Sequence, residues 1–248
     1  MNKIKLIIAA ILFFCFFIPP NLLQAQSDWK YDAALYGWFA GMSGTVGVAN
    51  QEQQFEATLS DLLKNLTFTA GGHFEARNPK ISLILDVFYV GLKEDAQEVK
   101  TVGDSSFTPD ASVELDEWII EGSVGYRAMQ DLEVLISTRI FSLTADLLQS
   151  DQTIASTNKT WPAFYLGVRY LKEFDKKWYA TIRGDAGYGG AGFAWYANAA
   201  VGYRFSELFS LALAYRILNM DYDDGSGVDY FSFDGTMNGF GLGFVFSF

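Results

Sequence analysis

Residues 236–248 read TMNGFGLGFVFSF, and this stretch decides the fold. Side chains of a strand alternate between its two faces, so one face here is a continuous ladder of large apolar groups. The other face is almost bare backbone, with Gly239, Gly241 and Gly243 among its residues. An aromatic chain end without a polar tail favours lipid as the solvent of the apolar face. The ladder consists of Phe240, Leu242, Phe244, Phe246 and Phe248.

The beginning of the chain has the pattern of a secretory signal peptide. Two lysines precede an apolar run over residues 6–18, and a small-residue cleavage site ends at Ala25. The alternative is an N-terminal transmembrane anchor, but the run is shorter than the roughly 18 residues that span a bilayer. We therefore expect residues 1–25 to be removed on export and residues 26–248 to form a single domain.

Composition makes nucleic acid an unexpected partner. Lys3 and Lys5 belong to the signal peptide, so 16 of the 18 basic residues remain against 29 acidic ones, for a formal charge of −13. Cys15 is the only cysteine and is also removed with the signal peptide. The mature chain is therefore expected to have neither disulfides nor thiol chemistry.

Alternation with period two predicts ten strands. Most are long enough for the 9 to 11 residues that a tilted membrane strand needs. Short and long connections alternate between them, as in an outer-membrane barrel with short periplasmic turns and longer external loops. We therefore predict an all-β fold, a closed antiparallel up-and-down transmembrane β-barrel of ten strands, with eight as the alternative. The expected strands cover residues 30–47, 66–78, 80–92, 112–127, 132–143, 159–171, 177–187, 193–205, 208–221 and 236–248.

Aromatic residues at the positions expected to face outward lie near both ends of the expected strands. Tyr126, Trp178 and Phe248 fall near the periplasmic ends, and Tyr89 and Trp118 fall toward the outer ends. Amphipathic rings favour the two membrane interfaces. The alternative, a soluble β-sandwich, predicts no such preference for strand ends.

Arginines near mid-strand decide which face is the lumen. Facing an arginine to lipid at the bilayer midplane costs roughly 2 to 4 kcal/mol, so these residues must point inward. Acids and arginines share that phase in equal number, and we expect a network of ion pairs and hydrogen bonds that satisfies its own members. A charged constriction lining a pore is the alternative. The expected lumen set is Asp32, His73, Glu75, Arg77, Asp86, Glu117, Glu121, Arg127, Glu133, Arg139, Arg169, Arg183, Asp185, Arg204 and Arg216.

Barrel size bounds what could pass through such a lumen. Side chains just fill an eight-stranded barrel, whereas sixteen strands enclose an aqueous channel. Ten strands leave room for a narrow water-filled path but not for large solutes. Small residues on the inner face of the last strand leave space for arginines from elsewhere in the barrel.

One helical segment is expected in the first long connection. Leu59, Leu62, Leu63 and Leu66 follow the spacing of one helical face. A helix this short cannot stand alone in water. We expect it to cap or enter the barrel mouth, with packing against the outer rim as the alternative.

The last long connection carries a weaker hypothesis. Its aspartates are hard oxygen ligands of the kind that calcium and magnesium prefer, although their spacing is not that of an EF-hand loop. Solvated loops are the simpler explanation of this acidic stretch. The aspartates are Asp221, Asp223, Asp224 and Asp229.

Enzymatic hypotheses depend on His73, the only histidine. His73 is expected to face the lumen, like Glu75, and lies near the short turn at Pro79. No serine or cysteine nucleophile is evident in the sequence. A lone histidine without cysteine cannot supply the usual zinc ligands. We expect a satisfied lumen histidine, no enzyme activity, no metal and no cofactor. The alternative is a barrel enzyme acting on lipid or peptide.

Several short segments carry a resemblance over nearly the whole mature chain: residues 35–38 (LYGW), 72–77 (GHFEAR), 183–185 (RGD), 202–205 (GYRF) and 214–216 (AYR). They resemble small bacterial outer-membrane β-barrel proteins, a largely uncharacterised group that includes opacity- and porin-like barrels.

The resemblance implies integral placement in the outer membrane, surrounded by its lipid, and no catalytic residue can be carried over from it. It also implies that Phe244, Phe246 and Phe248 form the terminal signal read by the barrel-assembly machinery. The expected function is that of a non-enzymatic barrel, either structural and surface-displayed or a narrow channel for ions and small solutes.

Overall fold

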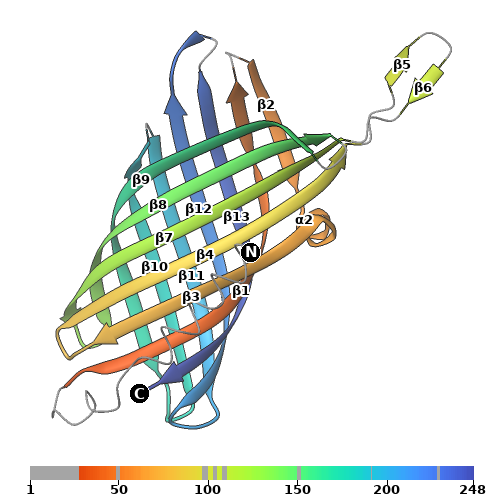
Figure 1. Cartoon of the computed structure of the whole chain (residues 1–248). Coiled ribbons are helices and arrows are strands. Elements are labelled where there is room, and N and C mark those ends of the chain that lie inside the picture. The colour runs from red at the N-terminus through yellow and green to blue at the C-terminus, as the bar shows by residue number, and fades with distance from the viewer. Residues whose placement is uncertain are drawn as a thin grey trace.

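A computed structural model describes residues 28–48, 51–96, 100–102, 105–107, 111–149, 152–190, 192–227 and 230–248. The signal peptide expected over residues 1–25 lies outside these ranges. Within them, ten antiparallel strands form a closed barrel, as predicted (Figure 1). The barrel strands are β1 (Lys30–Val48), β3 (Leu66–Arg77), β4 (Ile81–Ala96), β7 (Ala111–Met129), β8 (Leu132–Gln149), β9 (Gln152–Glu173), β10 (Trp178–Gly189), β11 (Gly192–Arg204), β12 (Phe209–Asp224) and β13 (Phe231–Ser247).

The last strand closes the barrel. β13 pairs with β12 on one side and with β1 on the other over the full length of the ladder. At the very end, the Tyr31 and Phe248 backbones exchange two hydrogen bonds, each of 2.9 Å. The predicted apolar ladder faces outward, with Phe240 and Phe244 each about half exposed. No helix among the described residues is long and apolar enough to cross a membrane.

Short turns join the strands at one end of the barrel, called here the turn end. Asn78 Oδ1 accepts hydrogen bonds of 2.8 Å from the backbone N–H groups of Lys80 and Ile81. Asp175 Oδ1 accepts from the backbone of Lys177 and Trp178 at 2.6 and 2.7 Å. Such side-chain-to-backbone bonds are the reason asparagine and aspartate favour tight turns. These two amides hold the pKa of Asp175 below its usual value.

At the opposite end, called the outer end, the strands run further than predicted. The connection expected over residues 144–158 is largely a hairpin, because β8 continues to Gln149 and β9 begins at Gln152. Alternation of apolar and polar residues marks a strand only where its two faces meet different environments. Beyond the membrane both faces meet water, so a paired strand can continue there without an apolar pattern.

Four smaller elements also lie toward the outer end. β2 (Gln51–Ala57) pairs with the outer part of β1, and β5 (Lys100–Val102) pairs with β6 (Ser105–Phe107) in a separate hairpin. The predicted helix is confirmed as α2 (Leu59–Asn65). Its expected position at the barrel mouth is wrong, because α2 lies at the wall beside β1 and β4 (Figure 1). Leu59 and Leu63 of α2 pack there against a break in the sheet.

The outer surface of the barrel is an apolar band bounded by aromatic pairs. Trp178 packs edge-on against Tyr203 near the turn end, with ring centroids 4.8 Å apart. Tyr89 and Trp118 pack toward the outer end at 4.7 Å. This distribution is typical of a barrel surrounded by lipid. Exposed apolar residues between the two groups include Leu83, Leu85, Ile136, Leu166, Ile182 and Leu213.

Candidate functional site in the barrel lumen

Arg169 on β9 lies at the centre of one charged cluster near the turn end. It forms a bidentate pair with Glu75 on β3, with N–O distances of 2.8 and 2.7 Å. The same guanidinium donates to Glu133 on β8 at 2.6 Å. Arg127 lies 3.3 Å from the other Glu133 oxygen. Bidentate pairs between arginine and carboxylate are the strongest and most directional of such contacts, so these side chains have little freedom to move.

A second cluster lies around Arg139 on β8, which is 1% exposed. Its Nε donates to Glu121 at 2.7 Å, and its Nη2 donates to Asp185. Its guanidinium also lies over the rings of Tyr165 and Tyr196, 4.2 and 4.3 Å from their centroids. Arginine faces of this kind gain both stacking and cation–π attraction. Arg183 lies 2.7 Å from both Glu121 and Asp185 and completes the cluster.

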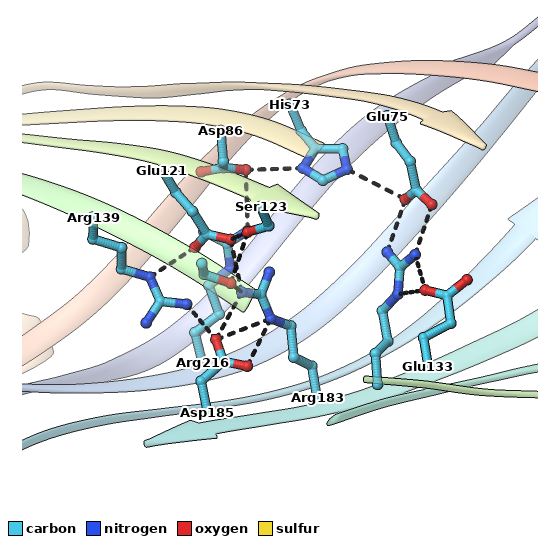
Figure 2. Close-up of polar contacts among 12 residues, drawn as sticks. His73, Glu75, Asp86, Glu121, Ser123, Glu133, Arg139, Arg183, Asp185 and Arg216 are labelled. Carbon is cyan, nitrogen blue, oxygen red and sulfur yellow. Dashed lines mark hydrogen bonds and ion pairs between the residues drawn. The ribbon is translucent and has the colours of Figure 1, made fainter. Parts of the chain in front are cut away.

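His73 lies between two carboxylates, as Figure 2 shows. Its Nδ1 is 3.0 Å from Asp86, and its Nε2 is 3.8 Å from Glu75. Asp86 also accepts a hydrogen bond from the Tyr36 hydroxyl. Both imidazole nitrogens therefore face acids, and neither faces a hydroxyl or thiol that it could activate as a nucleophile.

Arg216 and Arg77 have different surroundings. Arg216 donates to the Tyr36 hydroxyl at 3.1 Å and is 3.9 Å from Asp86. Its guanidinium also lies 4.4 Å from the centroid of the Tyr36 ring. Arg77 pairs with Asp32 at 2.8 Å, close to the turn end.

Two members of the predicted lumen set lie apart from the rest. Glu117 is 5% exposed, and its Oε2 has no hydrogen-bond partner among the described residues. It lies on the outer side of Ile119, among apolar groups. Arg204 pairs at 2.6 Å with Glu173, an acid that we did not predict, at the exposed edge of the turn end. Residues at alternate positions of a strand face the same side of the sheet. This alternation alone does not tell which other side chains surround each residue at its height along the barrel axis.

An apolar cluster fills the outer part of the lumen, and we did not predict it. Phe88 follows Asp86 on β4, and Phe141 follows Arg139 on β8, each one inward position closer to the outer end. The signal was present in the sequence, because these residues share the phase of the arginines. We call this cluster the apolar plug: Trp38, Ala40, Phe88, Val90, Ile119, Phe141, Trp161, Ala163, Tyr165, Ala194, Tyr196, Leu218, Met220, Phe233 and Met237.

Below the plug, a cavity of about 230 Å³ separates the charged clusters around Arg169 and Arg139 from the opposite wall. Glu173, Arg204 and Ser247 are among its lining residues, so it reaches the turn end. The opposite wall, formed by β11, β12, β13 and β1, carries Arg204, Arg216 and Asp32, but most of its other side chains are small. Those that line the cavity include Ala34, Ala200, Ala212, Ala214, Gly241 and Gly243.

The glycines of β13 have two different roles. A Cβ added to Gly239 would lie 2.0 Å from the Phe39 carbonyl oxygen, so no larger residue fits this close approach of β13 to β1. A Cβ added to Gly241 would meet its nearest neighbours at 3.4 and 3.8 Å, which is ordinary contact. A small side chain would therefore fit at position 241, and the glycine there leaves that space to the lumen cavity.

The aspartates of the last connection are not gathered around a common point in the described part of the chain. Asp224 lies 3.4 Å from Lys159 and 3.2 Å from the Tyr222 hydroxyl. Asp229 lies outside the described residues. No group of three or more histidine, cysteine, aspartate or glutamate residues in the described ranges is placed to hold a metal ion.

No protein-family model matches the chain, and no curated protein matches it. Among solved structures, it is similar to the attachment invasion locus protein Ail of Yersinia pestis, with 8% identity, a TM-score of 0.39, and coverage of 90% of this chain and 100% of that chain. The closed ten-stranded antiparallel barrel rests on the strand pairing of this chain itself.

Two further solved structures show the same likeness. The outer membrane protease OmpT from Escherichia coli has 8% identity and a TM-score of 0.47, covering 89% of this chain and 96% of its own. The Pseudomonas putida toluene transporter TodX has 8% identity and a TM-score of 0.36, covering 92% of each. Because the sequence identity is only 8%, the functions of these proteins are not assigned to this chain.

Proposed function

We propose that this protein is a non-enzymatic integral barrel of the bacterial outer membrane, sealed through its lumen, that displays its extended outer strands at the cell surface. The apolar plug carries this proposal. Phe88, Phe141, Trp161 and Met220 are each 3% exposed or less, although all four point into the lumen. Protein interiors packed in this way leave few voids larger than a water molecule, so a hydrated ion finds no path.

The charged clusters support the same proposal. Arg169 and Arg139 each contact two carboxylates at hydrogen-bond distance. A charge held in this way is a structural group, since moving it would leave its buried partners unpaired at a cost of several kcal/mol. The proposed surroundings are outer-membrane lipid, with the barrel-assembly machinery reading Phe244, Phe246 and Phe248 during biogenesis.

A narrow channel for ions and small solutes is the second candidate. The cavity of about 230 Å³ favours it, because this cavity reaches the turn end between charged walls. Conduction would also require an opening through the plug. A barrel enzyme has less support, because the contacts of His73 within the described residues are carboxylates and include no serine, threonine or cysteine that it could activate.

Single-channel recording on refolded protein in a planar bilayer tests the proposal. We expect no discrete conductance steps from the wild-type chain. The double variant Phe88→Ala and Trp161→Ala, which removes two plug side chains, is expected to conduct. Discrete steps from folded wild-type protein would overturn the sealed barrel in favour of the channel.

The matched control removes two aromatic side chains from the lipid-facing surface, at Phe164 and Phe240. Both are more than half exposed, and neither borders the lumen. This control is expected to stay silent in the bilayer. The shift in electrophoretic mobility between unheated and heated samples reports whether each variant has folded.

A further inference from the structure

The wall of the barrel is split between β1 and β3. The two strands pair from Lys30 opposite Arg77 to Tyr36 opposite Gly71. β1 has no further partner on that side until Met42, where its pairing with β2 begins. Residues 37–41 therefore pair with β13 alone among the described strands.

β3 continues past the split with β4 as its partner. The β3–β4 register shifts between Leu66 and Phe68, in the part of β3 that lies beyond its last pair with β1 at Gly71. One side-chain contact bridges the split, from the Thr69 hydroxyl to the Trp38 carbonyl oxygen at 3.4 Å.

The split lies at the height of the outer aromatic group. Phe68 borders it, and the Phe68 ring packs on Tyr89 with centroids 6.1 Å apart. Phe39, on the opposite edge, is 38% exposed, as is Phe68. An unpaired strand edge is costly where water is scarce, so some other group must cover it.

α2 covers this edge. Its Leu59 and Leu63 border a small cavity together with Trp38, Ala40 and Met42 of β1. The cavity volume is about 20 Å³, and all of its lining residues are apolar. Trp38 and Ala40 belong to the apolar plug, so the cavity lies between the plug and the lipid-facing surface. Leu63 remains 51% exposed and Leu59 37% exposed, which leaves the leucine face of α2 only partly covered.

The stability of α2 depends on this contact with the barrel wall rather than on the helix alone. It has seven residues, and helices shorter than about 12 to 15 residues are marginal in water. It continues directly into β3 at Leu66. A small rotation about that junction would uncover the apolar side chains of β1.

We propose that the β1–β3 split is a lateral groove that takes the acyl chain of a membrane lipid, with α2 as its lid. The groove is continuous with the surface that already contacts lipid, and Phe39 and Phe68 flank its entrance. The residues that line its cavity are all apolar, and the Thr69 hydroxyl that bridges the split is already bonded to the Trp38 carbonyl oxygen. This inference goes beyond the sealed barrel and does not depend on whether the lumen conducts.

Fluorescence quenching by lipids with brominated acyl chains tests the groove. Trp38 and Trp161 are both 3% exposed and both face the lumen, but only Trp38 borders the split. Two variants each keep one of them, with the other tryptophans of the chain replaced by phenylalanine. In brominated vesicles, we expect at least twofold stronger quenching of Trp38 than of Trp161.

The lid is tested in the Trp38-only chain. Leu59→Ser and Leu63→Ser together weaken the apolar face of α2, and we expect them to raise the quenching of Trp38 further. The matched control changes two exposed leucines outside the split, Leu208 in the turn before β12 and Leu213 on β12, to serine and is expected to leave it unchanged. Equal quenching of Trp38 and Trp161, with or without the lid substitutions, would overturn the proposal.

A second measurement avoids the multiple tryptophan replacements in case those chains fail to fold. Trp38→Phe alone, in the otherwise wild-type chain, is expected to remove a lipid-quenchable component of the fluorescence, whereas Trp161→Phe alone is not. Loss of the same component from both variants would also overturn the groove. Conductance is recorded separately, so failure of the groove and failure of the sealed barrel remain distinguishable.

Discussion

Glu117 is a charged residue type in a position where the surrounding side chains are apolar. Its carboxyl group is buried in the apolar plug without a partner for Oε2. Burying a polar group without a compensating hydrogen bond costs about 1 to 3 kcal/mol. We therefore expect Glu117→Leu to raise the free energy of unfolding by about that amount, measured by urea titration of protein refolded in lipid vesicles.

Glu121 provides the matched comparison. It lies four residues further along β7 and on the same face of the strand as Glu117. It is 6% exposed, but it accepts from Arg139 at 2.7 Å and lies 2.7 Å from Arg183. Removing one partner of a buried ion pair typically costs about 3 to 5 kcal/mol. Glu121→Leu should therefore lower stability where Glu117→Leu raises it. Equal losses from both substitutions would show that Glu117 has a stabilising partner after all.

The sequence predicts which side chains face the lumen, but not which of them meet. Glu75 and Arg169 are 94 positions apart and lie on strands that are not neighbours in the sheet. Their contact depends on the stagger of the strands around the barrel, which alternation does not encode. The same limit explains why Glu117 and Glu121, with identical phase, have opposite surroundings.

Among the elements, α2 depends on its first turn. The Thr58 hydroxyl accepts from the Asp61 backbone N–H at 3.3 Å, and the Asp61 carboxylate accepts from the Thr58 backbone at 3.2 Å, which completes a capping box. We expect Thr58→Ala to speed amide hydrogen exchange across residues 59–65. Exchange in the turn around Asp175 serves as the internal control and should not change.

Acidification should have the same effect on α2. The hydrogen bonds from Thr58 hold the pKa of Asp61 below its usual value. A carboxyl group with a lowered pKa stabilises the fold above its unfolded pKa and loses that contribution as the pH falls through the folded value. Protection of the amides of residues 59–65, taken as the exchange rate relative to the intrinsic rate at each pH, should therefore fall with acid in the wild type more than in Asp61→Asn. Parallel pH profiles would contradict a role for this carboxylate.

The elements inside the membrane were largely predictable, and those outside it were not. β10 was expected over residues 177–187 and covers Trp178–Gly189. β9 was expected to begin at residue 159 and begins at Gln152, because its outer part has water on both faces. The leucine spacing of α2 predicted the helix, but the break in the β1–β3 ladder that receives it leaves no pattern in the sequence.

For the whole molecule, the last strand has two roles that can be separated. The Phe248 backbone closes the barrel through its two hydrogen bonds with Tyr31, while its ring stacks on Tyr31 with centroids 6.0 Å apart. Phe248→Ala keeps the backbone bonds and loses only the ring contact, which is worth about 0.5 to 1.5 kcal/mol beyond buried area. Refolding into vesicles should therefore remain nearly complete.

Assembly in the cell should respond differently if the terminal ring is part of a signal. We expect Phe248→Ala to lower the folded, heat-modifiable fraction in the cell envelope several-fold while refolding in vitro stays near the wild-type yield. Phe240→Ala is the control, because it removes a ring from the same strand and face that also contacts a tyrosine, at 5.0 Å from Tyr215. If both variants assemble equally well in cells, Phe248 acts through packing alone. A loss confined to Phe248 separates recognition of the chain end from the closure that its backbone provides.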